Sequence, residues 1–113
     1  MRVITFTNHS PIRITSEDNV ETVYDAHWDF GHHLLKRYIT KRGKALYWAS
    51  ENSGRCYGTH NPETRRTYLP NAAAIRAYFV ERDQLEAYHA EIEADVDAAS
   101  IIDVDADPIT ENA

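Results

Sequence analysis

The stretch LLKRYITKRGKALYWASENSGRCY, residues 34–57, decides the expected fold. Apolar and polar side chains alternate on both sides of its centre, and a period of two is typical of a strand with two different faces. Gly43 lies at that centre and supplies the positive φ that a tight turn needs. We therefore expect an antiparallel hairpin, followed by a turn at 51–54 and a short strand at 55–59. A short helix over 34–40 is the competing interpretation, because its apolar residues also fit a period of 3.6.

The segment before this hairpin predicts a second hairpin and a helix. Residues 2–7 and 12–15 alternate around an Asn-His-Ser-Pro turn, in which His9 is expected to be a solvated loop residue. Ser16 is then a good N-cap, and the acidic residues after it suit the first turn of a helix. We expect that helix to end near Gly31, because glycine commonly terminates helices.

The last third of the chain reads as a strand followed by helices. Residues 65–69 predict the last strand, and Pro70 with the alanine-rich segment 71–80 predicts a helix. The helical pattern breaks at Asp83, which with Glu86 resembles a capping box and predicts a second helix or a kink. An apolar stripe follows on an otherwise acidic helix. Its residues are Leu85, Tyr88, Ile92, Val96 and Ala99. The stripe packs either on the body of the domain or on a partner, and a homodimer through this helix is one such arrangement.

Together these elements predict one α+β domain over residues 1–100. It has an antiparallel sheet built of hairpins, one helix after the first hairpin and a C-terminal helical arm. Residues 101–113 are acidic and poor in large apolar side chains, so we expect a flexible tail. The chain has one cysteine, no recognisable secretory signal and no transmembrane run, which predicts a cytoplasmic protein without membrane contact.

Charge is distributed unevenly along the chain. The 113 residues include 12 Lys and Arg against 18 Asp and Glu, a net charge of −6. Residues 34–66 contain eight basic and two acidic side chains, whereas residues 71–113 contain two basic and eleven acidic ones. The two regions therefore offer different surfaces to different partners, or to each other.

Five ligand-type side chains before the central hairpin form the densest cluster of their kind. They are Asp25, His27, Asp29, His32 and His33. On one continuous helix four of them would share a face, which is a credible ligand set for zinc or another divalent ion. Gly31 would interrupt that helix, and the spacing matches no dedicated motif. We therefore favour a solvated helix end and expect no metal or cofactor.

Basic and aromatic side chains alternate along the expected sheet, an arrangement that suits single-stranded nucleic acid. The set comprises Lys36, Arg37, Lys41, Arg42, Lys44, Arg55, Arg65 and Arg66 with Tyr38, Tyr47, Trp48, Tyr57 and Tyr68. Strand alternation can equally place the aromatic side chains inside and the charges outside. The residues expected to contact a partner are Lys36, Arg37, Arg42, Lys44 and Trp48. Nucleic acid is a less favoured partner than protein.

The acidic arm carries the other expected contact residues. These are Glu91, Glu93, Asp95 and Asp97. A negative stripe is ordinarily a solvated helix face, and in some acidic proteins it imitates nucleic-acid phosphates. Asp103, Asp105 and Asp107 lack the glycine and distal glutamate of a calcium loop. Cys56 and His60 lack a third, orienting group, so we expect no catalytic residue.

The order of RVITFTNHSPIRIT, a Trp-bearing acidic segment, RCYG and LPNAAAIRAYF resembles that of small accessory proteins encoded by phages and mobile elements. The resemblance covers roughly the first 80 residues and carries over no functional residues. It implies a non-enzymatic protein that binds a host or phage protein, anti-CRISPR and other anti-defence inhibitors included. The alternatives are a metal-dependent hydrolase built on the Asp/His cluster and a nucleic-acid-binding module built on the basic hairpin.

Overall fold

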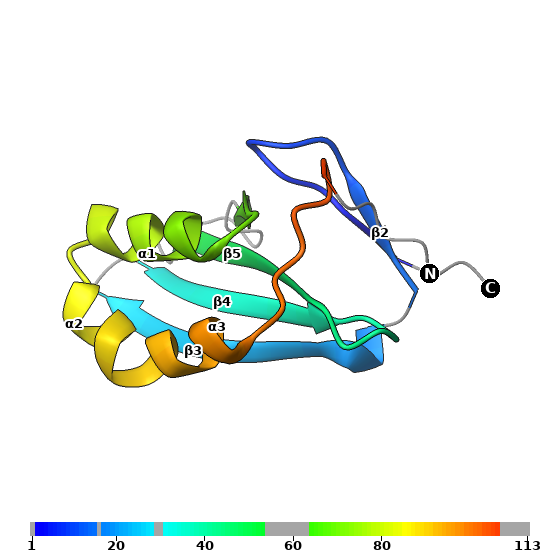
Figure 1. Cartoon of the computed structure of the whole chain (residues 1–113). Helices are drawn as coiled ribbons and strands as arrows, with labels where there is room; N and C mark the ends of the chain where they lie inside the picture. Colours follow the sequence, from blue (N-terminus) through cyan, green and yellow to red (C-terminus); the bar gives the residue numbers. More distant parts are fainter. Residues whose placement is uncertain (1, 16, 29–30, 54–63, 107–113) are drawn as a thin grey trace.

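The structure, a computed structural model, describes residues 2–15, 17–28, 31–53 and 64–106 (Figure 1). Its small antiparallel sheet pairs β1 (Arg2–Ile4) with β2 (Ile12–Ile14). Its large antiparallel sheet has the order β3-β4-β5-β6. These strands are β3 (Val20–Trp28), β4 (Gly31–Ile39), β5 (Ala45–Ser53) and β6 (Thr64–Leu69). The expected α+β class with antiparallel hairpins is confirmed.

The central hairpin is confirmed as β4 and β5. The Thr40 N–H donates to the Lys44 carbonyl (2.9 Å), and Gly43 has the positive φ (79°) expected of the turn. The turn expected at 51–54 is wrong for 51–53, because β5 continues to Ser53. Glu51 there pairs with β4 on one side and β6 on the other, so the ladder extends the strand.

The helix expected after the first hairpin is wrong. Only a short 3₁₀ turn, η1 (Glu17–Asn19), follows Ser16, and the strand β3 comes next. A β-bulge shifts the register of β3 between Thr22 and Tyr24. Because of the bulge, the neighbouring residues Val23 and Tyr24 both pack against the core that lies between the sheet and the helices. Strict strand alternation would send them to opposite faces, so the sequence pattern here resembles that of a helix. Pairing with β4 along the whole strand outweighs the capping signal.

Strand alternation gives the large sheet two faces, each with its own core. One core joins Leu35, Tyr47, Ala49 and Leu69 of the sheet to Ile75, Phe79, Tyr88, Ile92 and Val96 of the helices. The other joins Tyr38, Leu46, Trp48 and Tyr68 to Ile4, Ile12 and Ile14 of the small sheet and to Ile102. The helices lie over one end of the large sheet and the small hairpin over the other (Figure 1).

The first helix begins where the sequence predicts it. The side chain of Asn71 caps α1 (Ala72–Glu81) by accepting from the Ala74 N–H (2.8 Å). The expected break is confirmed at Asp83, which has a φ of 56°. The expected capping box is wrong, because Gln84 is the N-cap of the next helix and its side chain makes no capping bond.

The rest of the arm comprises α2 (Leu85–Ala87), a π-helical turn η2 (Tyr88–Ile92) and α3 (Glu93–Ala98). Tyr88, Ile92 and Val96 of the predicted stripe are 1–2% exposed and belong to the helix-side core. The stripe therefore packs on the body of the same chain, as the first of the two expected arrangements has it.

Residues 100–102 pair with β5 beyond the point where β6 ends. The Ala45 N–H donates to the Ser100 carbonyl, and the Ile102 N–H donates to the Ala45 carbonyl, each at 2.8 Å. Ala45 and Ile101 form a parallel bridge there. The pairing of β6 with β5 ends at Tyr47, and residues 100–102 pair with Ala45 at the start of β5 in its place.

Tyr68 holds the next residues of this segment. Its hydroxyl donates to the Ile102 carbonyl and accepts from the Val104 N–H, each at 2.9 Å. Ile102 itself is 3% exposed. Residues 101–106 of the expected tail are therefore attached to the body, and residues 107–113 lie outside the described part of the chain.

Candidate functional site

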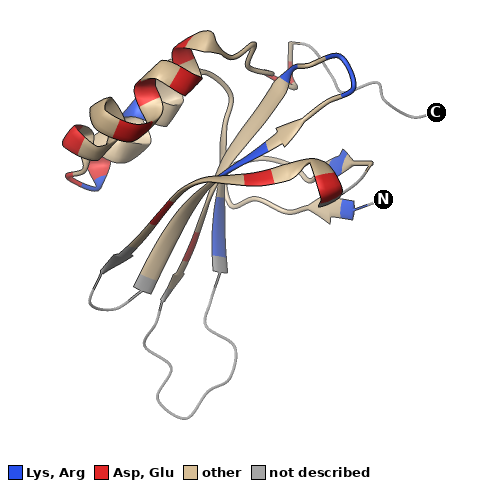
Figure 2. Ribbon diagram, turned by 90° about the horizontal axis from the view of Figure 1, so that it is seen from below, with Lys and Arg blue, Asp and Glu red and all other residues tan. Residues whose placement is uncertain are grey.

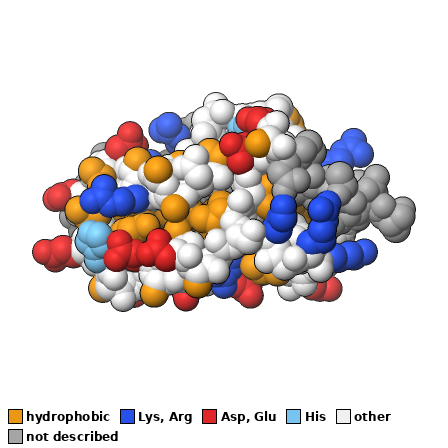
Figure 3. Space-filling view, viewed as in Figure 1, with side chains coloured by type: hydrophobic (Ala, Val, Ile, Leu, Met, Phe, Trp, Pro, Cys, Tyr) orange, Lys and Arg blue, Asp and Glu red, His pale blue; other side chains and the backbone are white. Residues whose placement is uncertain are grey.

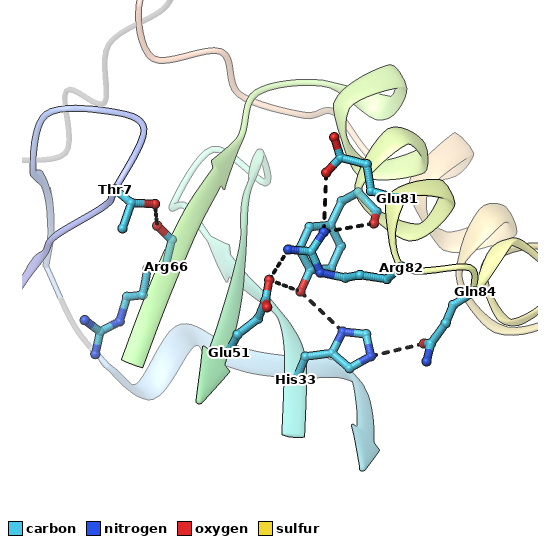
Figure 4. A network of polar contacts seen from close by, with 8 residues as sticks. Thr7, His33, Glu51, Arg66, Glu81, Arg82 and Gln84 are labelled. Atoms are coloured by element: carbon cyan, nitrogen blue, oxygen red, sulfur yellow. Dashed lines mark hydrogen bonds and ion pairs between the residues drawn. The ribbon is translucent and has the colours of Figure 1, made fainter. Parts of the chain in front are cut away.

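A buried polar network links the large sheet to the turn between α1 and α2 (Figure 4). His33 of β4, at its centre, is 0% exposed. Its Nδ1 lies 3.3 Å from the Tyr78 hydroxyl of α1, and its Nε2 lies 3.1 Å from the side-chain oxygen of Gln84. The Tyr78 hydroxyl donates to Glu51 of β5 (2.9 Å), and Glu51 also pairs with Arg82. The network ties two strands to the helical arm through side chains.

The directions of these hydrogen bonds constrain the state of the His33 ring. The Tyr78 hydroxyl uses its single proton on Glu51, so it can only accept from His33 Nδ1. Burial is the largest effect on the pKa of His33 and lowers it, which favours the neutral ring. The Gln84 side-chain oxygen, which also accepts from the Tyr24 hydroxyl (3.1 Å), faces Nε2. A neutral ring donates from only one nitrogen, so it satisfies either Tyr78 or Gln84 but not both at once.

Arg82 covers the outer side of the network. Its guanidinium carbon lies 3.7 Å from the centre of the Tyr78 ring, and its Nη1 lies 3.5 Å from the carboxylate of Glu81. Burial and the Glu51 carboxylate raise the pKa of Tyr78, so its hydroxyl stays protonated. Every buried side-chain polar atom of the described residues has a hydrogen-bond partner. The network is therefore complete without a ligand and acts as a junction between sheet and arm.

A groove of about 260 Å³ lies outside this junction, between α1 and β6. Its charged side chains are Arg65, Glu81 and Arg82. Arg82 is already paired with two carboxylates, whereas Arg65 makes no ion pair with a described residue. The described lining contains no histidine or cysteine. The groove therefore offers the exposed Arg65 side chain to another molecule.

The exposed side of α2, η2 and α3 is acidic, and Figure 2 shows acidic residues gathered along these helices. Segment 85–98 contains no lysine or arginine. Its exposed carboxylates are Glu86, Glu91, Asp95 and Asp97, and none of them makes an ion pair with a described residue. Glu93 pairs with His89 at 3.0 Å, and Figure 3 shows acidic side chains beside a histidine at the helical end of the molecule. We call the four unpaired carboxylates the acidic face.

His9 joins the first hairpin to the C-terminal segment, so the expected solvated role is wrong. Its Nε2 lies 2.9 Å from Asp105, its Nδ1 lies 2.8 Å from the Ser10 carbonyl, and its ring packs on Tyr68 with centroids 4.8 Å apart. A carbonyl and a carboxylate both accept, so the ring satisfies both only when it is protonated. The hydrogen bond to Asp105 and then that to Ser10 raise the pKa of His9.

The Asp/His cluster does not form the expected single face. Strand alternation sends His32 and His33 to opposite faces of the sheet. His32 lies 3.2 Å from Asp25, whereas His33 belongs to the buried network. The side chains of His27 and Asp29 lie outside the described residues. Among the side chains that are described, no group of three or more His, Cys, Asp or Glu could hold a metal ion.

The basic side chains of the central hairpin do not share one surface. Lys36 donates to a threonine of β3 on one face of the sheet, and Arg37 pairs with a glutamate of β3 on the other. Arg42 and Lys44 lie in the connecting turn. The expected contact residue Trp48 is 3% exposed and belongs to the core beneath the small sheet, so it is not available to a partner.

The aromatic side chains of the same hairpin are buried. Tyr38, Tyr47 and Tyr68 are 0–3% exposed, so the described sheet offers no aromatic platform for stacking bases. The remaining members of the predicted sets, Arg55, Cys56, Tyr57 and His60, lie in segment 54–63, outside the described residues. The sheet thus follows the ordinary pattern of aromatic side chains inside and charges outside.

Sequence reasoning missed the partners of His33. The sequence predicts a turn at Glu51, and it predicts only a helix and its break at Tyr78 and Arg82. Alternate residues of β5 face the helices, so Glu51 lies on the same face as Tyr47 and Ala49. Continuing that period past the expected turn is the signal that could have found the network.

Comparisons with protein-family models, with curated proteins and with solved structures find no match to this chain. The resemblance to phage accessory proteins therefore stays a prediction. The longest described helix, α1, has ten residues, and none of the described helices has the length and apolar character needed to cross a membrane.

Proposed function

We propose that the chain is a non-enzymatic binding protein that presents its acidic face to a basic surface of a partner protein. The observation that supports this is the exposure of four carboxylates without an ion pair among the described residues. The apolar stripe of the same helices is used inside the chain, so charge is what the arm offers outward.

A row of unneutralised carboxylates creates a negative potential that steers a basic partner and fixes its orientation. The arm is also held in place, because Tyr88, Ile92 and Val96 anchor it in the core and Gln84 ties its start to His33. Acidic side chains on a fixed frame lose less conformational freedom on binding than those on a flexible segment.

The partner we propose is a host or phage protein whose basic surface normally binds nucleic acid. Carboxylates on a helix can occupy such a surface in place of phosphates. A phage-encoded anti-defence inhibitor, of the anti-CRISPR kind or another, is the biological role that fits both this chemistry and the resemblance in sequence.

Capture of a partner tests the proposal. The tagged chain is incubated with host lysate, and the captured protein is identified, purified and titrated at salt concentrations from about 50 to 300 mM, across which exposed charges become screened. Neutralising the acidic face (E86Q, E91Q, D95N and D97N together) should abolish capture, and binding to the unmodified chain should weaken as salt rises.

The control for this variant removes charge elsewhere on the surface. Arg13 of β2 and Arg76 of α1 are exposed, so R13Q with R76Q should capture the partner as the unmodified chain does. If the acidic-face variant captured the same protein with the same salt dependence, the proposed surface would be wrong.

A further inference from the structure

The two outer edges of the large sheet differ in how the chain treats them. Along β6, the Thr7 N–H donates to the Arg66 carbonyl (2.9 Å), and the Asn8 side chain makes two bonds with the Tyr68 backbone (2.8 and 3.0 Å). Residues 100–102 continue this cover along the start of β5. Two segments distant in sequence therefore close one edge of the sheet.

Hydrogen-bond alternation shows which groups the opposite edge, β3, presents. In an antiparallel pair one residue directs both its N–H and its C=O to one side, and the next residue directs them to the other. The Tyr68 backbone faces outward from β6, and the observed register then carries the alternation across β5 and β4. It places Glu21 and Tyr24 toward β4, and Val20 and Thr22 away from the sheet.

Val20 and Thr22 have no backbone partner on that outer side among the described residues. Glu21 and Thr22 are exposed, so nothing described covers this part of the strand. A row of outward N–H and C=O groups on an edge strand is a template for an additional strand, and main-chain hydrogen bonds then supply the affinity.

The carboxylates are the more exposed charged groups along this edge. Glu21 (side chain 50% exposed) pairs with Arg37 (22%). Asp25 (51%) lies 3.2 Å from His32 (28%). Turn η2 lies beside β3, and Glu91 of the acidic face is close enough to contribute to the raised pKa of Tyr24. A strand laid along β3 would therefore place its helix-side side chains next to Glu21 and Glu91.

From these observations we infer that the outer edge of β3 is a docking strand for an extended, basic segment of the partner protein. This inference rests on the proposed function and names the element that receives the partner. The bulge at Val23 and the charged side chains hinder pairing between two identical flat edges, which favours a foreign segment over a second copy of this chain.

A synthetic peptide of about eight residues that alternates lysine and threonine is a suitable probe, since alternate side chains of a strand share one face. We expect it to bind, and to slow hydrogen exchange at the Thr22 amide by at least about tenfold, measured by NMR. The same peptide with N-methyl groups on alternate residues cannot donate its hydrogen bonds and should bind at least about tenfold more weakly.

Thr22→Pro removes the outward N–H and should abolish peptide binding, because proline on an edge strand breaks no bond within the sheet. Thr22→Val loses the same hydroxyl but keeps the N–H, and should bind as the unmodified chain does. The N-methylated peptide gives the same test on the unmodified chain, whatever Thr22→Pro does to folding.

With the peptide, the inference is overturned by no binding, by binding without protection of the Thr22 amide, or by equal binding of the N-methylated peptide. A concentration-dependent dimer that Thr22→Pro dissociates would assign the edge to a second copy instead. Partner capture that is lost in the acidic-face variant but kept in Thr22→Pro would leave the proposed function standing and remove the docking strand.

Discussion

Acidification should destabilise the protein through His33. The pKa of this buried ring is lowered in the folded state, whereas the unfolded chain keeps the ordinary value of 6.5. The unfolded state therefore binds more protons as the pH falls below 6.5, and the stability that the neutral ring contributes above that pH is progressively lost. One protonation site gives a slope of at most about 1.4 kcal/mol per pH unit.

The magnitude follows from the burial of the ring. A ring that took up no proton in the fold would set the upper limit: one proton with an unfolded pKa of 6.5, integrated between pH 7.5 and 5.5, gives a loss of at most about 1.4 kcal/mol. Protonation would also place a second cation near Arg82, which already pairs with Glu51 and Glu81. The loss should appear as loosening of the arm from the sheet.

Urea unfolding at several pH values between about 5.5 and 7.5, followed by tryptophan fluorescence and far-UV circular dichroism, measures this loss. His33→Gln keeps a hydrogen-bonding side chain in the same place but cannot titrate, so its stability should depend less on pH. The other histidines remain in the variant, and the difference between the two curves isolates His33. Identical pH dependence of the two proteins would refute the assignment of a neutral, buried ring.

Two further predictions concern the contacts that hold the ends of the chain. The pKa of His9 is raised, so the stability that it contributes is present below pH 6.5 and is lost as the pH rises through the raised value. The protection factors of the amides in residues 101–106, which correct for the intrinsic rise of exchange with pH, should then fall, and D105N should remove this fall. Ile92→Ala should lower the free energy of unfolding, measured with urea, by about 2–5 kcal/mol, because Ile92 lies in the core and is 1% exposed. Val80→Ala should lower it by less than about 1 kcal/mol, because Val80 is 47% exposed. Equal losses would contradict a packed arm.

The central hairpin could be predicted because its signals are local. Gly43 permits the turn, and alternation on both sides leaves one workable pairing. The strand β3 could not be predicted in the same way. Its bulge places Val23 and Tyr24 on one side, and a good N-cap precedes it, so the local sequence pattern favours a helix. Only the pairing with β4, which the local pattern does not contain, makes this segment a strand.

The candidate site was harder to predict because its residues come from four separate places in the chain. The sequence places His33 in the Asp/His cluster, for which it favours a solvated helix end over a metal site, whereas the partners Glu51, Tyr78 and Gln84 lie 18 to 51 residues away. Such contacts depend on how α1 crosses the sheet, which no short pattern encodes. The acidic face could be predicted, because burial of the apolar stripe on one side of these helices leaves the carboxylates on the opposite, exposed side.

The pairing of residues 100–102 with the start of β5 has a consequence for the order of folding. During synthesis the six described strands, β1 to β6, emerge before this segment, so the nascent sheet has an incomplete edge and an unengaged Tyr68 hydroxyl. The contact of His9 with Asp105 spans 96 positions, which makes it among the last that a growing chain can form. Completion of the fold is thereby coupled to completion of the chain through residue 105, and a shorter product carries an edge that can pair with other strands.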